Sequence, residues 1–482
     1  MPCLPPATIS PAGSRDGPRY RRIITAPPSR GRPDTVRRIP ITAAAAFLLL
    51  VLVIAGVETG LVALPGGPTT GPVAAASPSP SETELSSPPA ATPSPTPEPT
   101  PTPQPTPPPP TPRPTGIDEP GVVERLQAAL DAGQVALAAP GIQASVVFPD
   151  GRVWTGVSGV ADLATGRALG LDTPFAIASI SKTFVAAEVL LLVSEGRLSL
   201  DDAPARLLPK TRVAGRAIDP GITIRMLLDH TSGLGDYLIS AKLDAAVRAD
   251  PLAVWTPDQA LAYARRPVAA PGQGYHYANT NYVLLGLIVE GVTGRTLAQE
   301  LRARFFEPLG LASASYQGFE PPAAELPTAY RYGSIRLDAR PQDVTDGTAI
   351  RPFTSIITAT GAAGSLAMSA ADLARWGRAL YGGEILPPEL LGLMLADAGI
   401  TRTLDPAYPY GLGVQAFMID GRVTYGHSGR LVGARSILRW FPVEGVGIAI
   451  VTNESRFDAT PVLVEMLAIV APHDRMLSPR HR

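Results

Sequence analysis

A proline-rich stretch restricts where this chain can build a packed core. Residues 77–115 are dominated by Ser, Thr and Pro, and runs such as Thr-Pro-Ser-Pro-Thr-Pro-Glu-Pro repeat a proline at every second position. Such a sequence lacks the apolar side chains of a core and favours extended polyproline II conformations. At about 3 Å per residue it would reach on the order of 100 Å. We therefore expect a stalk, with the folded part of the chain on its C-terminal side.

The N-terminal segment has the pattern of a membrane anchor. Residues 1–38 are polar and carry many arginines, whereas residues 39–64 are mainly apolar and charged only at Glu58. About 19 apolar residues suffice to cross a bilayer, and arginines mark the cytoplasmic side. Ala74-Ala-Ala76 would suit cleavage of a signal peptide, but its distance from the apolar run favours an uncleaved anchor. We predict a single-pass protein of the cell membrane with a basic cytoplasmic tail (1–38), a transmembrane anchor (39–64), a disordered linker (65–116) and an extracytoplasmic domain (117–474).

Charge and residue content exclude several classes of partner. The formal net charge is −1 and the basic run is confined to the N-terminal tail, so we expect no nucleic-acid binding. The single cysteine lies in that tail, so the exported domain needs no disulfide. None of the five histidines has a ligand-like spacing with another, and no phosphate-binding glycine loop stands between a strand and a helix. We expect no metal and no cofactor, and a small-molecule or peptide substrate.

Strand patterns lie at both ends of the C-terminal part, and helical patterns lie between them. A hairpin is predicted around the Pro149-Asp-Gly151 turn, and the remaining predicted strands are near the C-terminus (143–148, 152–158, 410–417, 422–425, 434–441 and 446–452). Periodicity and caps predict the principal helices (122–132, 223–228, 281–292, 369–380 and 458–470). Thr256 and Pro257 open a further helix as N-cap and first residue, Gly294 ends the helix over 281–292, and Ser369-Ala-Ala-Asp372 resembles a capping box. We therefore predict an α+β fold, in which a mainly antiparallel sheet from both ends of the domain is flanked by helices and a helical subdomain is inserted.

Residues 175–196 carry the first candidate for catalysis, because they predict an apolar helix with a serine and a lysine at its start. Ser179 and Lys182 are three residues apart, which places both side chains on one helix face, about 5–6 Å apart at Cβ. A serine becomes a nucleophile when a neighbour removes its proton, and a lysine can do so if burial lowers its pKa. The chain has only three lysines in a background of arginine, which cannot be deprotonated. Alone, the pair is equally compatible with a solvated lysine below a helix-cap serine.

A second segment offers polar partners just before a predicted helix. Residues 271–282 contain Tyr277, a candidate proton relay whose phenol would ionise more easily beside an ammonium. They also contain Asn279, whose amide can both donate to and accept from a substrate amide. The alternative is a tyrosine that packs its ring and an asparagine that caps the next helix.

A third segment lies in a predicted turn and the start of a strand. Residues 425–433 contain His427, Ser428, Gly429 and Arg430 in succession. His427 would polarise a hydroxyl or contact an anionic substrate group, and Gly429 would let a substrate backbone approach closely. The alternative for His427 is a turn histidine in solvent.

The three segments together match, in order and spacing, the three motifs of serine β-lactamases and penicillin-binding proteins. Over about residues 120–472 the chain resembles the class C β-lactamase-like serine hydrolase family. Further matching stretches are Leu227–Leu234, Pro308–Leu311 and Gly361–Leu366. The resemblance implies a sheet of five or more antiparallel strands beside a helical subdomain, with the active site between them.

The resemblance also implies roles for the candidate residues. Ser179 would form an acyl-enzyme, with Lys182 as its base and Tyr277 assisting. Asn279 would orient the substrate amide, and the backbone N–H groups of Ser179 and Arg430 would form the oxyanion hole. The third motif is His427-Ser428-Gly429 where β-lactamases have Lys-Thr-Gly, which resembles the D-alanyl-D-alanine carboxypeptidase and esterase branches. A histidine would bind a substrate carboxylate more weakly at neutral pH.

We therefore expect a membrane-anchored extracytoplasmic serine hydrolase that works through an acyl-serine intermediate. D-Ala-D-Ala carboxypeptidase-like activity on cell-wall peptides is favoured, and peptidoglycan is the corresponding partner. A carboxylesterase or a β-lactamase of the same family is the alternative. From another class, a sensor that binds penicillin or cell-wall peptides without turnover remains open. The walls of the substrate pocket are expected from residues 236–256 and 316–350.

Overall fold

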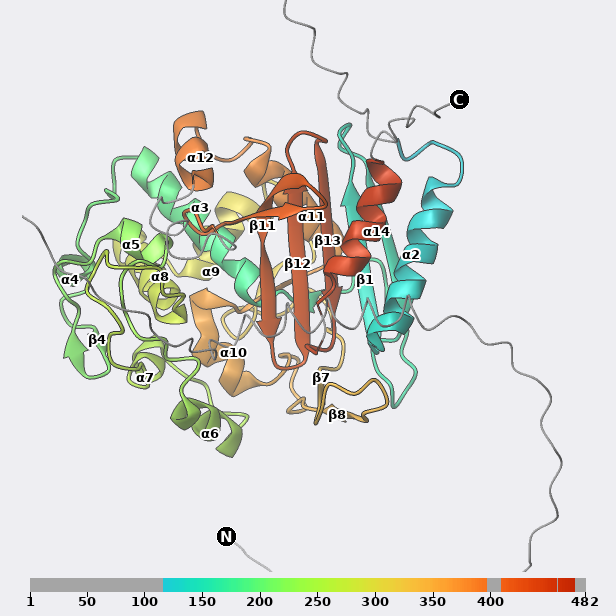
Figure 1. The fold of residues 1–482 in the computed structure, drawn as a ribbon. Helices are drawn as coiled ribbons and strands as arrows, with labels where there is room; N and C mark the ends of the chain where they lie inside the picture. Colours follow the sequence, from blue (N-terminus) through green and yellow to red (C-terminus); the bar gives the residue numbers. More distant parts are fainter. Residues whose placement is uncertain (1–115, 397–408, 457, 473–482) are drawn as a thin grey trace, which may run out of the picture. The chain divides into compact units, whose positions relative to one another are not determined.

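The computed structural model describes residues 116–396, 409–456 and 458–472 (Figure 1). The tail predicted over 1–38, the anchor over 39–64 and nearly all of the linker over 65–116 lie outside these ranges. Within them, no helix combines the length and the apolar character needed to cross a membrane.

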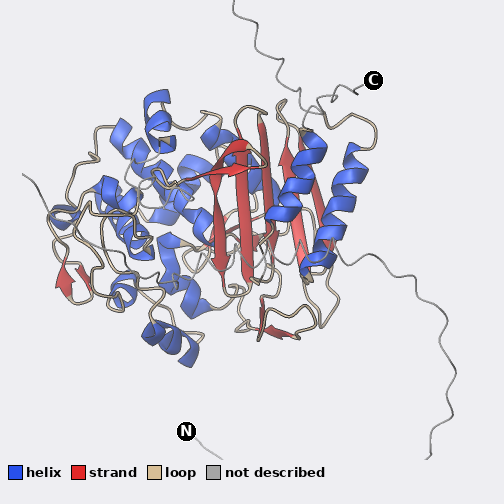
Figure 2. Ribbon diagram, in the orientation of Figure 1, coloured by secondary structure: helices blue, strands red, loops and turns tan. Residues whose placement is uncertain are grey.

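A six-stranded antiparallel sheet is built from both ends of the described domain, as predicted (Figure 2). Its spatial order is β10-β11-β12-β13-β1-β2. The two early strands form a hairpin, and β1 pairs with the last strand, with Ile142 opposite Thr452. The bounds are Gly141–Val147 (β1), Val153–Gly159 (β2), Gln415–Ile419 (β10), Arg422–Leu431 (β11), Ala434–Phe441 (β12) and Val446–Thr452 (β13). The prediction of an α+β fold with a mainly antiparallel sheet is confirmed.

Two of the predicted strands differ from the structure by more than two residues at one end. The strand predicted over 422–425 continues to Leu431, because β11 pairs with β12 along its whole C-terminal half and this pairing outweighs the weak strand propensity of its glycines. The strand predicted over 410–417 begins only at Gln415. Before it, Gly413 has φ +81°, and a Cβ there would lie 2.4 Å from Ala186 Cβ. The loop therefore packs directly on the helix that follows Ser179, which requires glycine.

Helices cover both faces of the sheet. Helices α2 (Val122–Leu137) and α14 (Thr460–Val470) lie side by side on one face, where they share an apolar cluster with β1, β12 and β13 (Figure 1). Helix α11 (Ala370–Tyr381) packs on the other face, and its Trp376 stacks on Phe184 with the ring centroids 3.7 Å apart. The core that holds the catalytic helix therefore adjoins the sheet directly.

The remaining described helices and short strands lie between β2 and β10 in the sequence, and most of them lie beside the sheet (Figure 2). The helices are α3 (Ser181–Ser194), α4 (Pro204–Leu207), α5 (Ile224–Leu228), α6 (Ala241–Ala249), α7 (Pro257–Leu261), α8 (Asn279–Thr293), α9 (Leu297–Leu301), α10 (Thr354–Thr360) and α12 (Pro388–Leu395). Three single-turn helices are also present: the 3₁₀ helices η1 (Ala178–Ile180) and η3 (Gly361–Ala363), and the short π-helix η2 (Arg302–Phe306). Short strands are β3 (Phe175–Ala176), β4 (Arg212–Val213), β5 (Arg216–Ala217), β6 (Ser315–Tyr316), β7 (Tyr330–Tyr332), β8 (Pro341–Asp343) and β9 (Leu366–Met368).

Local capping signals hold where they were predicted, with one exception. Thr256 and Gln259 form a full capping box, and Gly294 ends α8 at φ +73°. Ser369 accepts from the backbone N–H of Asp372, but the Asp372 carboxylate does not return the bond. It accepts instead from the backbone and hydroxyl of Ser313, so the box predicted over 369–372 is only half formed.

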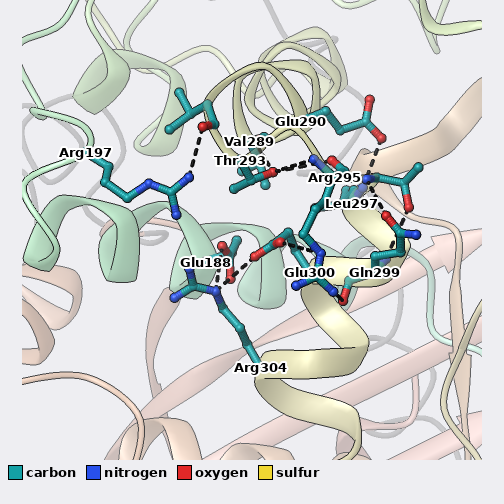
Figure 3. A network of polar contacts seen from close by, with 12 residues as sticks. Glu188, Arg197, Val289, Glu290, Thr293, Arg295, Leu297, Gln299, Glu300 and Arg304 are labelled. Atoms are coloured by element: carbon teal, nitrogen blue, oxygen red, sulfur yellow. Dashed lines mark hydrogen bonds and ion pairs between the residues drawn. The ribbon is translucent and has the colours of Figure 1, made fainter.

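Helix α3 is buried on nearly all sides and carries one acidic side chain into the core. Glu188 is fully buried, and its carboxylate faces Arg304, with 3.3 Å between Glu188 Oε1 and Arg304 Nε. Figure 3 shows that Arg304 also binds Glu300, and a salt bridge joins it to Glu195 as well. Within the described residues neither Glu188 oxygen accepts a hydrogen bond. Burial raises the pKa of Glu188 to about 7, against a smaller opposing effect of Arg304.

Candidate active site

Ser179 lies on the 3₁₀ turn η1, between the short strand β3 and helix α3. The preceding residue, Ala178, has φ +48°, a conformation that strains a residue with a Cβ. The turn is held from the sheet, because Ser436 Oγ on β12 donates to the carbonyl of Ile177 at 2.7 Å. The serine is thus presented by a tight turn fixed against β11 and β12 rather than by the first turn of the helix itself.

The Lys182 ammonium points directly at this serine. Its Nζ donates to Ser179 Oγ at 3.0 Å, to Asn279 Oδ1 at 2.9 Å and to the carbonyl of Ala363 at 2.6 Å. A neutral amine keeps two N–H donors and gains one lone pair. The amide oxygen and the carbonyl can only accept, whereas the serine hydroxyl can donate. Deprotonated Lys182 therefore has one arrangement that satisfies all three neighbours, and it aims the lone pair at Ser179.

Burial lowers the pKa of Lys182 to about 7, with the charge of Asp236 opposing this shift. The side chain is fully buried. A substantial fraction of the lysine is therefore neutral near pH 7, which is what a general base for a serine requires. This matches the sequence interpretation of Lys182 as a residue chosen for deprotonation.

Tyr277 is the third member of the cluster, and its protonation state differs from the sequence expectation. Its ring centroid is 5.1 Å from Lys182 Nζ. We expected a nearby ammonium to favour the phenolate. Instead, burial raises the pKa of Tyr277 above its ordinary value, because desolvation of a phenolate outweighs the opposing effect of the Ser179 hydroxyl. Tyr277 is a phenol in this site and can pass a proton only by accepting and donating together.

Asn279 is oriented by an acidic residue that the sequence interpretation did not single out. Its Nδ2 donates to Asp236 Oδ2 at 3.0 Å, while its Oδ1 accepts from Lys182. A carboxylate can only accept, so Asp236 fixes which end of the amide faces the lysine. Burial raises the pKa of Asp236, and the Asn279 amide and the Lys182 charge partly counter this. Asn279 is itself buried. With these two bonds made, one N–H and one lone pair of its amide remain for a substrate.

His230 holds the loop that carries these residues. It follows α5 with φ +62°, and its Nδ1 accepts from the backbone N–H of Ala278 at 3.2 Å. Its ring packs on Tyr277 with the centroids 4.2 Å apart. Both contacts suit a neutral imidazole, and burial keeps the pKa of His230 well below its ordinary value.

The third segment lies along β11 rather than in a turn. Ser428 donates its backbone N–H to Gln415 Oε1 at 2.9 Å, on the side of β11 away from β12. Residues two apart on a strand direct their N–H groups the same way, so the N–H of Arg430 faces that edge too. The turn bearing Ser179 also packs against β11. This geometry suits the oxyanion hole expected from the N–H groups of Ser179 and Arg430.

The packing of the turn that presents Ser179 requires glycine at position 429. A Cβ at this position would lie 2.2 Å from the carbonyl oxygen of Ile177 and 2.2 Å from Ser436 Oγ. Any larger residue would displace that turn. The approach of a substrate backbone to Gly429 stays a prediction.

His427 is not a turn histidine in solvent, because it lies on a strand with its ring centroid 6.3 Å from that of Tyr277. It is buried, and its Nδ1 lies 2.6 Å from the carbonyl oxygen of Ser428, which can only accept. Nδ1 therefore carries the proton, and Nε2, 3.0 Å from the Tyr410 hydroxyl, accepts from it. Burial and the Lys182 charge keep the pKa of His427 well below its ordinary value. His427 is thus a neutral side chain with both nitrogens engaged inside the protein.

A large cleft of about 680 Å³ adjoins the C-terminal end of β11. Arg430 and Leu431 line one side, and Leu238, Arg248 and Tyr332 belong to the facing walls. These walls come from the segments 236–256 and 316–350 that we expected to border the substrate. Ser179, Lys182, Tyr277 and Asn279 are not among the residues that line this cleft.

The fold and the cluster around Ser179 define a serine hydrolase with a β-lactamase fold. A family model for Beta-lactamase matches residues 123–468, and the chain belongs to this family. Penicillin-binding protein 4 of Amycolatopsis lactamdurans is 32% identical over 338 residues, which cover 68% of this chain and 84% of that protein. The resemblance predicted from the three motifs is therefore confirmed.

Two further relatives are hydrolases. A D-aminopeptidase of Brucella anthropi is 30% identical over 62% of this chain, and the match spans about half of that enzyme, 53%. The crystal structure of a D-stereospecific amidohydrolase from Streptomyces sp. has a TM-score of 0.61 and 31% identity, over 72% of this chain and 97% of that one. Together with the family, these relatives support hydrolase activity for this chain.

Proposed function

We propose that Ser179 is the nucleophile of an acyl-transfer reaction and that the favoured activity is hydrolysis of peptides ending in D-Ala-D-Ala. The observation that carries the catalytic part is the contact between Lys182 Nζ and Ser179 Oγ at 3.0 Å, made by a buried lysine. Neutral Lys182 takes the hydroxyl proton as Ser179 Oγ attacks the substrate carbonyl. The N–H groups of Ser179 and Arg430 stabilise the oxyanion, a contribution of about 2.7–4 kcal/mol per donor in general.

Collapse of the tetrahedral intermediate breaks the amide bond. The leaving amine takes a proton from Lys182, directly or through the Tyr277 phenol, and an acyl-serine ester remains. A water molecule then attacks the ester and gives its proton to Lys182, directly or through the Tyr277 phenol. The ester bond breaks, Lys182 returns the proton to Ser179 Oγ, and the acid product leaves. Asn279 and its partner Asp236 keep the lysine aligned throughout.

The substrate class rests on the relatives and on the third segment. A penicillin-binding protein and a D-stereospecific amidohydrolase are both similar to most of the folded part of this chain. Neither similarity distinguishes one amide substrate from another. His427 is neutral, so it offers no positive charge to bind the carboxylate of a substrate. A D-stereospecific amidase or a small-ester esterase is therefore the second candidate, favoured by the D-aminopeptidase relative. The sensor hypothesis requires acylation without turnover.

The test compares full-length protein with a Ser179→Ala variant and a matched control. Ser194→Ala removes a hydroxyl from the far end of helix α3, which among the described residues donates only to the carbonyl of Leu191. Fluorescent penicillin labelling, D-alanine release from an acylated D-Ala-D-Ala peptide and hydrolysis of nitrophenyl acetate are measured for each. We expect Ser194→Ala to behave as the parent and Ser179→Ala to lose labelling and turnover. If Ser179→Ala retained them, the assigned nucleophile would be wrong; stable labelling without turnover would favour the sensor.

We also propose that residues 39–64 anchor the protein in the cell membrane with the hydrolase domain outside the cytoplasm. The apolar run and the arginines before it support this topology. Fractionation of cells that express the full chain, with protease added to intact spheroplasts, tests it. Recovery of the full-length chain in the soluble fraction would contradict the anchor, and protection from external protease would contradict the orientation.

A further inference from the structure

A cluster of positive side chains lies on the helical part, at an edge away from the sheet. It occupies helix α4, the hairpin of β4 and β5, and the loop that follows α7 (Figure 1). Six exposed residues form this basic patch: Arg206, Lys210, Arg212, Arg216, Arg265 and Arg266. The stretch over 203–226 contains five basic residues and a single acidic one, Asp219. The patch therefore concentrates positive charge on one part of the surface.

The two segments of the basic patch are joined by the fold. Ala214, in the turn between β4 and β5, donates its backbone N–H to the carbonyl of Leu261 at 3.0 Å, and Leu261 is the last residue of α7. Arg265 and Arg266 follow within five residues of that contact. On the hairpin, Val213 is buried while Arg212 and Arg216 are exposed. The buried side chain fixes the hairpin on the domain and leaves its arginines to the solvent.

The charges of the basic patch are not compensated by carboxylates. Within the ranges that the structure describes, none of the six side chains forms an ion pair. The Arg212 guanidinium is held by two neutral acceptors, with Nη1 donating to the carbonyls of Pro209 at 2.9 Å and Thr211 at 3.0 Å. Exposed arginines elsewhere, such as Arg152 and Arg336, pair with neighbouring carboxylates. The patch thus has a positive potential that an anionic ligand would neutralise.

This potential stands out against the charge of the rest of the chain. The formal net charge is −1 although residues 1–38 carry eight arginines and only two acidic residues. The remainder of the chain is therefore net negative, and the basic patch is a local exception. Five of its six members are arginines, whose planar guanidinium donates paired hydrogen bonds to the oxygens of a phosphate group. Six cations spread over two segments suit a chain of anions better than a single ion.

We propose that the basic patch binds a linear polymer of phosphate groups and thereby holds the domain on that polymer. The inference goes beyond the proposed hydrolase activity and does not depend on it. It agrees with the proposed anchor and stalk, since a domain at the end of a long linker meets the polymers of a cell envelope rather than lipid headgroups. The Val268 N–H donates to the carbonyl of Gly233 at 2.9 Å, so the polymer is held by the subdomain that carries Asp236.

The experiment first maps the contact residue by residue in the full-length protein. Arginine side chains are labelled with phenylglyoxal and identified by mass spectrometry, in the free protein, with long-chain polyphosphate, and with orthophosphate at the same total phosphate concentration. We expect polyphosphate to slow the labelling of the five patch arginines on the order of 10-fold, and orthophosphate to leave it unchanged, because only a polymer engages several cations at once. Arg152 and Arg336 are the internal references, and their labelling should stay the same.

Affinity is then compared between two full-length variants that lose the same charge. The patch variant carries Arg206→Gln, Lys210→Gln, Arg212→Gln and Arg216→Gln. The control variant carries Arg125→Gln, Arg152→Gln, Arg336→Gln and Arg340→Gln, which are also exposed. We expect the patch variant to bind polyphosphate at least about 10-fold more weakly, with the dependence of log Kd on log salt concentration shallower by about 3. The control variant should bind as the parent does, and both keep the arginines of residues 1–38.

Each outcome either supports the inference or overturns it. Labelling that polyphosphate slows equally at the patch and at Arg152, an equal loss of affinity in the two variants, or an unchanged affinity of the patch variant would each overturn it. Protection of the patch by phosphatidylglycerol bilayers, with none by polyphosphate, would assign the patch to a lipid surface and overturn it as well. If the patch variant failed to fold, the labelling of the parent would still decide. Loss of D-alanine release would refute the proposed function only.

Discussion

Glu188 makes the stability of the catalytic helix depend on pH in a direction opposite to that of most carboxylates. Its pKa is raised to about 7 from an ordinary 4.5, mainly by burial. Between these two values the folded state holds a proton that the unfolded state has released, so stability falls as pH rises through this range. The shift of about 2.5 units corresponds to about 3 kcal/mol of lost stability above pH 7.

The perturbation is Glu188→Gln, which keeps the shape of the protonated acid and removes the titration. We expect the variant and the parent to unfold alike near pH 4.5, and the variant to be more stable by about 3 kcal/mol at pH 8. Urea denaturation, followed by fluorescence at several pH values, measures both. The unfolding of the described domain is compared at equal ionic strength, because Arg304 also binds two further carboxylates.

Glu195 is the matched control, because it binds the same arginine but its pKa is shifted in the opposite direction to that of Glu188. Its hydrogen bond to Arg304 lowers the pKa of Glu195 below its ordinary value. Its stabilisation is therefore present above the ordinary pKa and disappears as pH falls through the lowered one. Glu195→Gln should reduce stability at pH 8 and have little effect at low pH. If Glu188→Gln were destabilising at pH 8, the assignment of an uncompensated buried carboxylate would be refuted.

Two further predictions concern the active site. For nitrophenyl acetate, kcat/KM should rise with pH through about 7 as Lys182 loses its proton. Asp236→Asn should move this rise to lower pH, because the Asp236 charge raises the pKa of Lys182. A rise that moved to higher pH in the variant would contradict this. Gly429→Ala should lower both the melting temperature and the activity, because the new Cβ would clash with the Ile177 carbonyl. The control is Gly392→Ala in helix α12, where no atom lies within 4 Å of the new Cβ, and it should be neutral or stabilising by up to about 1 kcal/mol. Equal melting temperatures for the two variants would refute the packing argument.

Much of the fold and of the candidate site could be predicted from local sequence. The order of strands and helices, the N-cap at Thr256 and the glycine end of α8 at Gly294 follow from residue preferences that act over a few positions. The Ser179–Lys182 pair follows from the spacing on one turn. The strand that contains His427 was predicted too short, because its pairing partner β12 extends it beyond what its glycines favour.

The sequence by itself determined which chemical groups are present and which of them share a turn: a serine and a lysine three apart, and a tyrosine and an asparagine before a helix. The tertiary structure alone decided their protonation and orientation. Lys182 reaches Ala363, 181 positions away, and Asn279 meets Asp236, 43 positions away. Burial by remote segments makes Lys182 easier to deprotonate and keeps Tyr277 a phenol and His427 neutral. Desolvation depends on what the whole fold packs around a group, and no local pattern encodes it.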